Sequence, residues 1–236
     1  MRNKFGFILV KPQIGENIGA CARSLKNFGF QKLDIVEPKE SWLNSKAKAT
    51  SVGAYDILKK AKVFKSTYDV IKNYDIVISL SARKRDINKK HISMRQFQNI
   101  IIKKNKINFG LMFGPEASGL SNYDLSYSNY ILQIPTSKKF KSLNLSHSLT
   151  LVCYEIFKII NSKVFNAKEK KLKIASKNDV GILLKYLKDL LNKKSFFTPP
   201  EKKKSMIINI NNLIYRLEPN NKELRILASI LSTLYK

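Results

Sequence analysis

Residues 108–120 read NFGLMFGPEASGL, an apolar run that passes straight into a glycine-containing turn. The run 108–113 predicts a buried β-strand, because it is short and apolar and ends at Gly114-Pro115. Glu116 is the only charged residue of the stretch. In a parallel sheet, ligands bind outside the carboxyl ends of the strands. The turn after this strand is therefore a candidate binding site.

Strands and helices alternate on both sides of this stretch. Further short apolar runs predict strands at 4–10, 32–36, 62–64, 75–80 and 130–134. Apolar residues at helical spacing predict helices within 15–29, 45–61, 93–104 and 144–161. This alternation predicts an α/β fold built on a parallel sheet with helical crossovers.

The C-terminal third of the chain has a different pattern. Residues 163–177 are basic and lack a period, which predicts a linker. Three helical stretches follow, at roughly 178–192, 201–216 and 219–234, and prolines separate them. We therefore expect an α/β domain over 1–162, a basic linker over 163–177 and a small all-helical extension over 178–236.

The composition is strongly basic. The 236 residues include 44 Lys+Arg against 17 Asp+Glu, a formal net charge of +27, which indicates a polyanionic partner such as nucleic acid. Only seven of the basic residues are arginines, and lysine, isoleucine and asparagine all have A/T-rich codons, so genome bias is an alternative source of the charge. No apolar run approaches the ~18 residues of a membrane span, and no secretory leader is expected.

Several kinds of site are excluded by their missing residues. The chain has no G-x-G, so the dinucleotide fingerprint is absent, and Leu120 stands where a phosphate-binding loop needs lysine. His91 and His147 lie far apart, and no acidic cluster has ligand spacing, so we expect no metal site. Cys21 and Cys153 fit no metal or disulfide framework, which indicates a reducing cytoplasm.

Three motifs occur in order along the first 160 residues. The first is N-x-G-x-x-x-R at 17–23, the second is FGPEASGL at 113–120, and the third combines IPT at 134–136, SLNLS at 142–146 and YE at 154–155. The ordered set resembles the SpoU/TrmH branch of the SPOUT methyltransferases. The helical extension, with its closing ELRIL at 223–227, looks like the TrmJ subgroup of tRNA ribose 2′-O-methyltransferases, which act on nucleotide 32 of the anticodon loop.

The resemblance implies a fold, a cofactor and partners. The C-terminal part of the α/β sheet would be threaded into a trefoil knot, and the protein would be a cytoplasmic homodimer that binds tRNA and not DNA. The helical extension at 178–236 would help to bind the tRNA phosphates. The knot loops would hold S-adenosylmethionine, mainly through backbone groups. By position, the cofactor residues are Leu80, Ser81, Ala82, Phe113, Gly114, Ile134, Pro135, Lys141, Ser142 and Leu143.

The resemblance also implies catalytic roles. Arg23 would lie beside the phosphate and ribose of the target nucleotide, where it would orient the 2′-hydroxyl, because an arginine is a poor base. Asn17 and Asn144 would position Arg23 and the ribose. Glu116 would hold the geometry of the site, and Ser142 would contact cofactor or ribose. The reaction needs two positioned reactants and one assisted proton transfer, but no metal.

Two alternatives stay open at this point. One is a ribosomal RNA ribose 2′-O-methyltransferase of the same branch, and the other is a non-catalytic RNA-binding relative. A membrane-surface protein rests on charge alone, and the lysines form no single amphipathic face.

Overall fold

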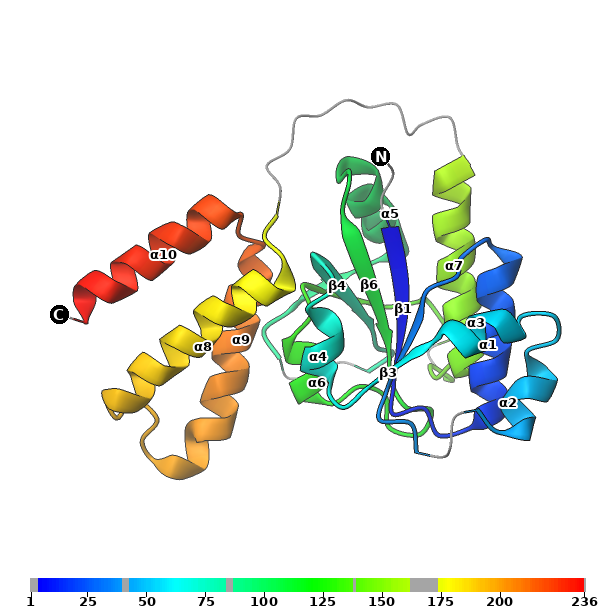
Figure 1. Cartoon of the computed structure of the whole chain (residues 1–236), viewed down its shortest axis with the longest axis horizontal. Coiled ribbons are helices and arrows are strands. Elements are labelled where there is room, and N and C mark those ends of the chain that lie inside the picture. Colours follow the sequence, from blue (N-terminus) through cyan, green and yellow to red (C-terminus); the bar gives the residue numbers. More distant parts are fainter. Residues whose placement is uncertain (1–3, 40–42, 84–86, 138, 162–173, 236) are drawn as a thin grey trace.

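The computed structural model describes residues 4–39, 43–83, 87–137, 139–161 and 174–235, and a seven-stranded sheet forms its centre (Figure 1). The strands are β1 (Lys4–Val10), β2 (Leu33–Val36), β3 (Lys62–Phe64), β4 (Ile76–Leu80), β5 (Lys90–Ile92), β6 (Asn108–Phe113) and β7 (Tyr130–Leu132). Their order is β3-β2-β1-β6-β4-β7-β5, and every pairing is parallel. The predicted α/β fold with a parallel sheet is confirmed.

Helices cover both faces of the sheet. One face carries α1 (Gly15–Asn27), α2 (Ser45–Thr50), α3 (Tyr55–Lys60), α5 (Met94–Lys103) and α7 (Leu145–Asn161). The other carries α4 (Thr67–Ile71) and α6 (Asn122–Ser126), together with α8 (Lys177–Lys193), α9 (Lys203–Leu217) and α10 (Asn221–Leu234). A short 3-10 turn, η2 (Pro200–Lys202), precedes α9.

The order of the strands brings three loops together. β6 lies between β1 and β4, and β7 lies between β4 and β5, so each enters between strands that precede it in the chain. Because all strands are parallel, the carboxyl ends of β4, β6 and β7 meet at one edge of the sheet. The turn after residues 108–113 therefore faces the loops after β4 and β7.

A tyrosine lies flat on the middle of the sheet. Gly6 of β1 and Gly110 of β6 are opposite each other, and the Tyr74 ring fills the space that their missing side chains leave. A Cβ on Gly110 would lie 2.9 Å from the Tyr74 ring. The Tyr74 hydroxyl donates a hydrogen bond of 2.6 Å to Asp34 Oδ2 on β2. Burial raises the pKa of the Asp34 carboxyl, and this hydrogen bond opposes that rise.

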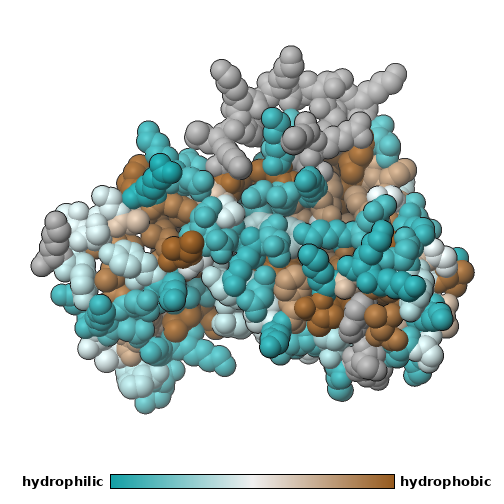
Figure 2. Space-filling model, in the orientation of Figure 1, coloured by the Kyte–Doolittle hydropathy of each residue, from teal (hydrophilic) through white to brown (hydrophobic). Residues whose placement is uncertain are grey.

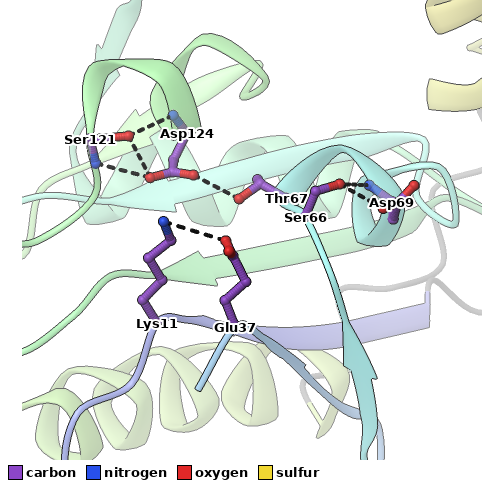
Figure 3. Close-up of polar contacts among 7 residues, drawn as sticks. All are labelled: Lys11, Glu37, Ser66, Thr67, Asp69, Ser121 and Asp124. Carbon is purple, nitrogen blue, oxygen red and sulfur yellow. Dashed lines mark hydrogen bonds and ion pairs between the residues drawn. The ribbon is translucent and has the colours of Figure 1, made fainter. Parts of the chain in front are cut away.

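Capping contacts fix the short helices of the second face (Figure 3). Ser66 caps α4, and Ser121 and Asp124 form a capping box on α6. Thr67 Oγ1 donates to Asp124 Oδ1 over 2.7 Å, which joins the two helices.

The C-terminal helices share the core of this second face. Val180, Leu183 and Leu184 of α8 and Tyr215 of α9 are buried in the same cluster as Val77 on β4. Figure 2 shows hydrophilic residues across much of this view, with hydrophobic patches over both the α/β part and the C-terminal helices. No helix of the described ranges has the length and apolar character to cross a bilayer.

Some element predictions differ from the structure. The range 45–61, expected to be helical, contains two helices, α2 and α3, and Gly53 adopts a φ of +76° between them. The strand at 62–64 is confirmed, whereas β5 and α4 are additional. Most of the linker predicted at 163–177 lies outside the described residues, and the division into domains stays a prediction.

We predict that Tyr74→Phe lowers the free energy of unfolding by about 1–3 kcal/mol, because Asp34 would be buried without its donor. Denaturant unfolding measures this loss. Tyr55→Phe is the control, since the Tyr55 hydroxyl has no partner among the described residues and should change stability little. Equal stability of the Tyr74→Phe variant and the parent would contradict the role of this hydrogen bond.

Candidate active site

A cavity of about 460 Å³ opens at the carboxyl ends of β4, β6 and β7. Its wall comes from the loops at 80–83, 113–119, 132–134 and 141–143, with two residues of α7. Every residue that the resemblance assigned to the cofactor lines this cavity, except Pro135. Leu80, Phe113, Ile134 and Leu143 make much of the wall apolar.

Gly114 lets the turn after β6 fold back on itself. A Cβ at this position would lie 2.5 Å from the carbonyl carbon of Gly119 and closer still to the backbone nitrogen of Leu120. The Gly119 N–H donates to the Pro115 carbonyl over 2.8 Å, which closes the turn. Any side chain at 114 would push this backbone away, so the cavity wall requires glycine here.

Hydrogen bonds connect Glu116 to two other motifs. Asn17 Nδ2 donates to Glu116 Oε1 over 2.9 Å, and Asn144 Nδ2 donates to Asn17 Oδ1 over 3.0 Å. Asn144 Oδ1 then accepts from the backbone N–H and hydroxyl of Ser146, at the start of α7. The three motifs, far apart in sequence, therefore form one polar chain beside the cavity.

The polar chain includes a residue that the motif analysis did not name. The Gln13 N–H donates to Glu116 Oε2 over 2.9 Å, and Gln13 Oε1 accepts from the Ala117 N–H over 3.2 Å. Gln13 follows Pro12 at the end of the first strand run, and its side-chain type gave no signal in the sequence. Gln13 belongs to the site only because it contacts the turn that contains Glu116 and Ala117.

Cationic side chains stand at the cavity. Arg83 and Lys141 are exposed and line it, and Arg83 Nη2 donates to the Ala117 carbonyl over 3.3 Å. Arg83 is a second residue that the motif analysis missed. With Glu116, these are the charged groups of the lining, so the cavity suits a ligand that carries both charges and an apolar part.

Arg23 lies apart from the polar chain. It is on the exposed side of α1, whereas Asn17 is on the buried side. Among the described residues, no hydrogen bond or ion pair holds its guanidinium. Ser142 lines the cavity, so the structure brings together four of the five catalytic candidates: Asn17, Glu116, Ser142 and Asn144.

The thiols do not suit nucleophilic catalysis. Cys21 and Cys153 are both buried, and burial raises the pKa of each thiol well above its ordinary value. The Glu116 carboxylate raises the pKa of Cys21 further. Within the described ranges, no three His, Cys, Asp or Glu side chains gather as metal ligands would.

Known proteins resemble this chain over most of its length. The model of the SpoU rRNA Methylase family matches residues 4–154. A tRNA (cytidine-2′-O-)-methyltransferase TrmJ of Methanocaldococcus jannaschii is 32% identical, over 92% of this chain and 93% of that protein. The crystal structure of TrmJ from Z. mobilis ZM4 has a TM-score of 0.87 at 30% identity, and the match covers 98% of this chain and 99% of that one.

A more distant structure shares the fold. The SpoU methyltransferase AviRb from Streptomyces viridochromogenes, solved in complex with the cofactor AdoMet, has a TM-score of 0.55 at 18% identity. The match covers 69% of this chain and 60% of that one. With a cavity at the carboxyl ends of β4, β6 and β7, and with the family model matching most of its length, the chain belongs to the SpoU methylase family.

Proposed function

We propose that this protein methylates a ribose 2′-hydroxyl of tRNA at anticodon-loop nucleotide 32, in the cytoplasm, with S-adenosylmethionine as methyl donor. The observation that carries the proposal is the hydrogen-bonded chain Glu116–Asn17–Asn144, which lies beside the cavity that Gly114 lines. The similarity to TrmJ proteins over nearly the whole chain supports tRNA as the substrate.

The residues of the cavity fit S-adenosylmethionine. Its volume of about 460 Å³ is within the usual range for small-molecule sites, and the close backbone turn at Gly114 leaves room for a ligand against main-chain atoms. Leu80, Phe113 and Leu143 would surround the apolar parts of the donor, and Glu116 would face its positive charge. When bound, S-adenosylmethionine supplies an electrophilic methyl group.

The chain's own residues would position the ribose. Asn144 is exposed at the start of α7, where its amide is fixed by Asn17 and Ser146. Ser142 lines the cavity two residues earlier, close enough in sequence to contact the same ribose. Arg23 would bind the phosphate of the target nucleotide and stabilise negative charge at the 2′-oxygen through its guanidinium N–H donors.

We also propose that the chain forms a trefoil knot. The supporting observation is the strand order, in which β6 and β7 each enter between strands already present. In this order the later strands lie inside the sheet rather than at its edge, which is compatible with a threaded chain.

We further infer that two copies form a dimer over α1 and α7. Leu151, Tyr154 and Phe157 are exposed on α7, and the Phe28 ring lies 6.1 Å from Tyr154 and 5.7 Å from Phe157. Together these four residues make an apolar patch on the side of α1 and α7 away from the sheet. Such a patch favours a protein partner, and a second copy would bring a second site close to Arg23.

We predict that Leu151→Lys converts the dimer into a monomer and lowers methyl transfer, because a lysine would be buried in the interface. Sedimentation at matched concentrations measures the state of association. Ile182→Lys is the control, since Ile182 is an apolar residue on α8 that is 61% exposed, against 41% for Leu151. A dimer that persists in Leu151→Lys and dissociates in Ile182→Lys would place the interface on the C-terminal helices instead.

We predict that purified protein and labelled methyl donor produce 2′-O-methylnucleotide at position 32 of a tRNA transcript. Nucleoside mass spectrometry identifies the product, and fragment mapping identifies its position. The control transcript carries 2′-deoxyribose at nucleotide 32 and lacks the acceptor, so it should gain no label. Label in ribosomal RNA but not in tRNA would favour the ribosomal alternative, and no binding of S-adenosylmethionine would favour the non-catalytic one.

We predict that Arg23→Ala lowers methyl transfer by about 100-fold or more, because one charge-stabilising donor is lost. S-adenosylmethionine affinity should stay nearly unchanged, since Arg23 does not line the cavity. Steady-state kinetics and calorimetry measure the two effects. The control is Lys103→Ala, an exposed cation at the carboxyl end of α5. Full activity of Arg23→Ala would remove Arg23 from the reaction.

A further inference from the structure

The C-terminal helices end in a basic tip at the opposite end of the molecule from α1 (Figure 1). We define the tip as residues 193–204, which join α8 to α9, together with Tyr235 after α10. It contains five lysines, at 193, 194, 202, 203 and 204, and Glu201 is its only acidic residue. All five lysines are exposed, and the corresponding corner of Figure 2 is mostly hydrophilic.

One aromatic ring at the end of α8 is exposed to solvent. The Ser195 N–H donates to the Asn192 carbonyl, and the Phe196 N–H donates to the Leu191 carbonyl over 3.0 Å, the two bonds of a Schellman motif. Ser195 has the positive φ of 53° that this motif requires, without the usual glycine. The turn sends Phe197 into the interior, where it is 6% exposed, and leaves Phe196 47% exposed.

The two phenylalanines support each other. Their ring centroids are 5.5 Å apart in an edge-to-face arrangement, so the exposed Phe196 ring has a fixed neighbour. Lys203 Nζ lies 5.6 Å from the Phe197 ring. The exposed Phe196 ring therefore belongs to a surface whose charged side chains are mostly lysines.

The lysines at the start of α9 oppose the helix dipole. Lys193 and Lys194 lie at the carboxyl end of α8, where positive charge is favourable. Lys202, Lys203 and Lys204 lie at the amino end of α9, whose first turn holds no acidic residue, and positive charge is unfavourable there. Among the described residues, none of these three forms an ion pair. Helix stability does not account for them, whereas an anionic partner does.

Tyr235 extends the same surface. Its ring lies 5.6 Å from Lys193 Nζ and 5.3 Å from Lys194 Nζ. The carboxyl ends of α8 and α10 therefore meet at the tip, and rings and cations alternate across it.

We propose that the tip binds a single-stranded segment of RNA, with the lysines on its phosphates and one base stacked on Phe196. Proteins that bind single strands combine cationic grooves with aromatic platforms of this kind. A duplex would use the lysines but leave the ring without a partner. Two exposed rings among polar residues offer too little apolar surface for a bilayer. The proposal rests on the proposed function, because the tRNA substrate supplies the strand.

The first test concerns the lysines. We predict that the triple variant Lys202→Gln/Lys203→Gln/Lys204→Gln binds unmodified tRNA transcript roughly 10- to 100-fold more weakly near 0.1 M salt. The slope of log affinity against log salt should fall in magnitude by about 2, at ~0.7 for each lost phosphate contact. The matched control removes three exposed lysines from the α3–β3 region: Lys60→Gln, Lys62→Gln and Lys65→Gln. An equal loss in both variants would show that only net charge matters, and would overturn the proposal.

The second test concerns the aromatic ring. We predict that Phe196→Ala weakens binding to an oligo-uridylate by about 10-fold and leaves binding to duplex RNA unchanged. Phe196→Leu should show most of the same loss, because it keeps apolar area but cannot stack a base. If all of these proteins bind oligo-uridylate equally, the stacking site is wrong. Binding of the full chain to phosphatidylserine vesicles in preference to RNA would overturn the proposal in favour of a membrane surface.

Two measurements separate this inference from the proposed function. The tip variants should keep S-adenosylmethionine affinity, and at saturating tRNA they should keep kcat while KM rises. A parent protein that transfers no methyl group to tRNA yet loses RNA affinity in the tip variants would contradict the function and keep the tip. A parent that methylates tRNA with an unchanged KM in the tip variants would contradict the tip and keep the function.

Discussion

The arrangement of the site depends on the hydrogen bond from Asn17 Nδ2 to Glu116 Oε1. Glu116 is half-buried, and a carboxylate removed from water must be hydrogen-bonded. Its second oxygen accepts from the Gln13 N–H, so both oxygens are engaged by one segment, the start of α1 and the residues before it. The carboxylate therefore ties the turn after β6 to the end of β1.

The same bond orients the next residue. Because Asn17 Nδ2 faces the carboxylate, its Oδ1 is left to accept from Asn144. An aspartate at position 17 could not do both, since it has no donor for Glu116. Position 17 therefore requires an amide, which both donates and accepts. The hydrogen bond to Asn17 Oδ1 in turn orients the amide of Asn144.

Much of the fold follows from residue pattern, but the order of the strands does not. Runs such as 4–10 and 108–113 are long and apolar enough to predict buried strands, and the structure confirms them. β5 has only three residues, two of them exposed, so no apolar run marks it. The positions of β6 and β7 in the sheet depend on contacts between distant segments, which a periodicity argument does not contain.

The site, like the fold, is predicted only in part from the sequence. The motifs identified Asn17, Glu116 and Asn144, which the structure joins by hydrogen bonds. Gln13 acts partly through its backbone N–H, and backbone groups leave no residue-type signal. Arg23 had a motif position, yet its exposed side chain makes no hydrogen bond to this polar chain among the described residues, whereas Asn17 is buried.

Buried lysines connect the C-terminal helices to the α/β part. Lys89 Nζ donates to the carbonyls of Ser126 over 2.9 Å and Ser128 over 2.6 Å, and Lys177 Nζ donates to Asn129 Oδ1. Burial lowers the pKa of Lys89 to about 7 and that of Lys177 well below its ordinary value.

The lowered pKa of Lys89 determines how the stability of the folded chain depends on pH. The unfolded chain keeps protons on these amines up to about pH 10, and the folded chain releases the Lys89 proton near pH 7. The folded state therefore binds fewer protons between these values, and its stability rises with pH across that window.

The connection from β4 to β5 links these helices to the cavity. Its first residues, 81–83, line the cavity, and Arg83 reaches the turn that contains Glu116. Its last residues contact α9, where Arg216 Nη1 donates to Asn88 Oδ1 over 2.6 Å and Lys89 Nζ donates to the Asn212 carbonyl over 3.5 Å. One segment thus contacts the cavity at one end and the C-terminal helices at the other.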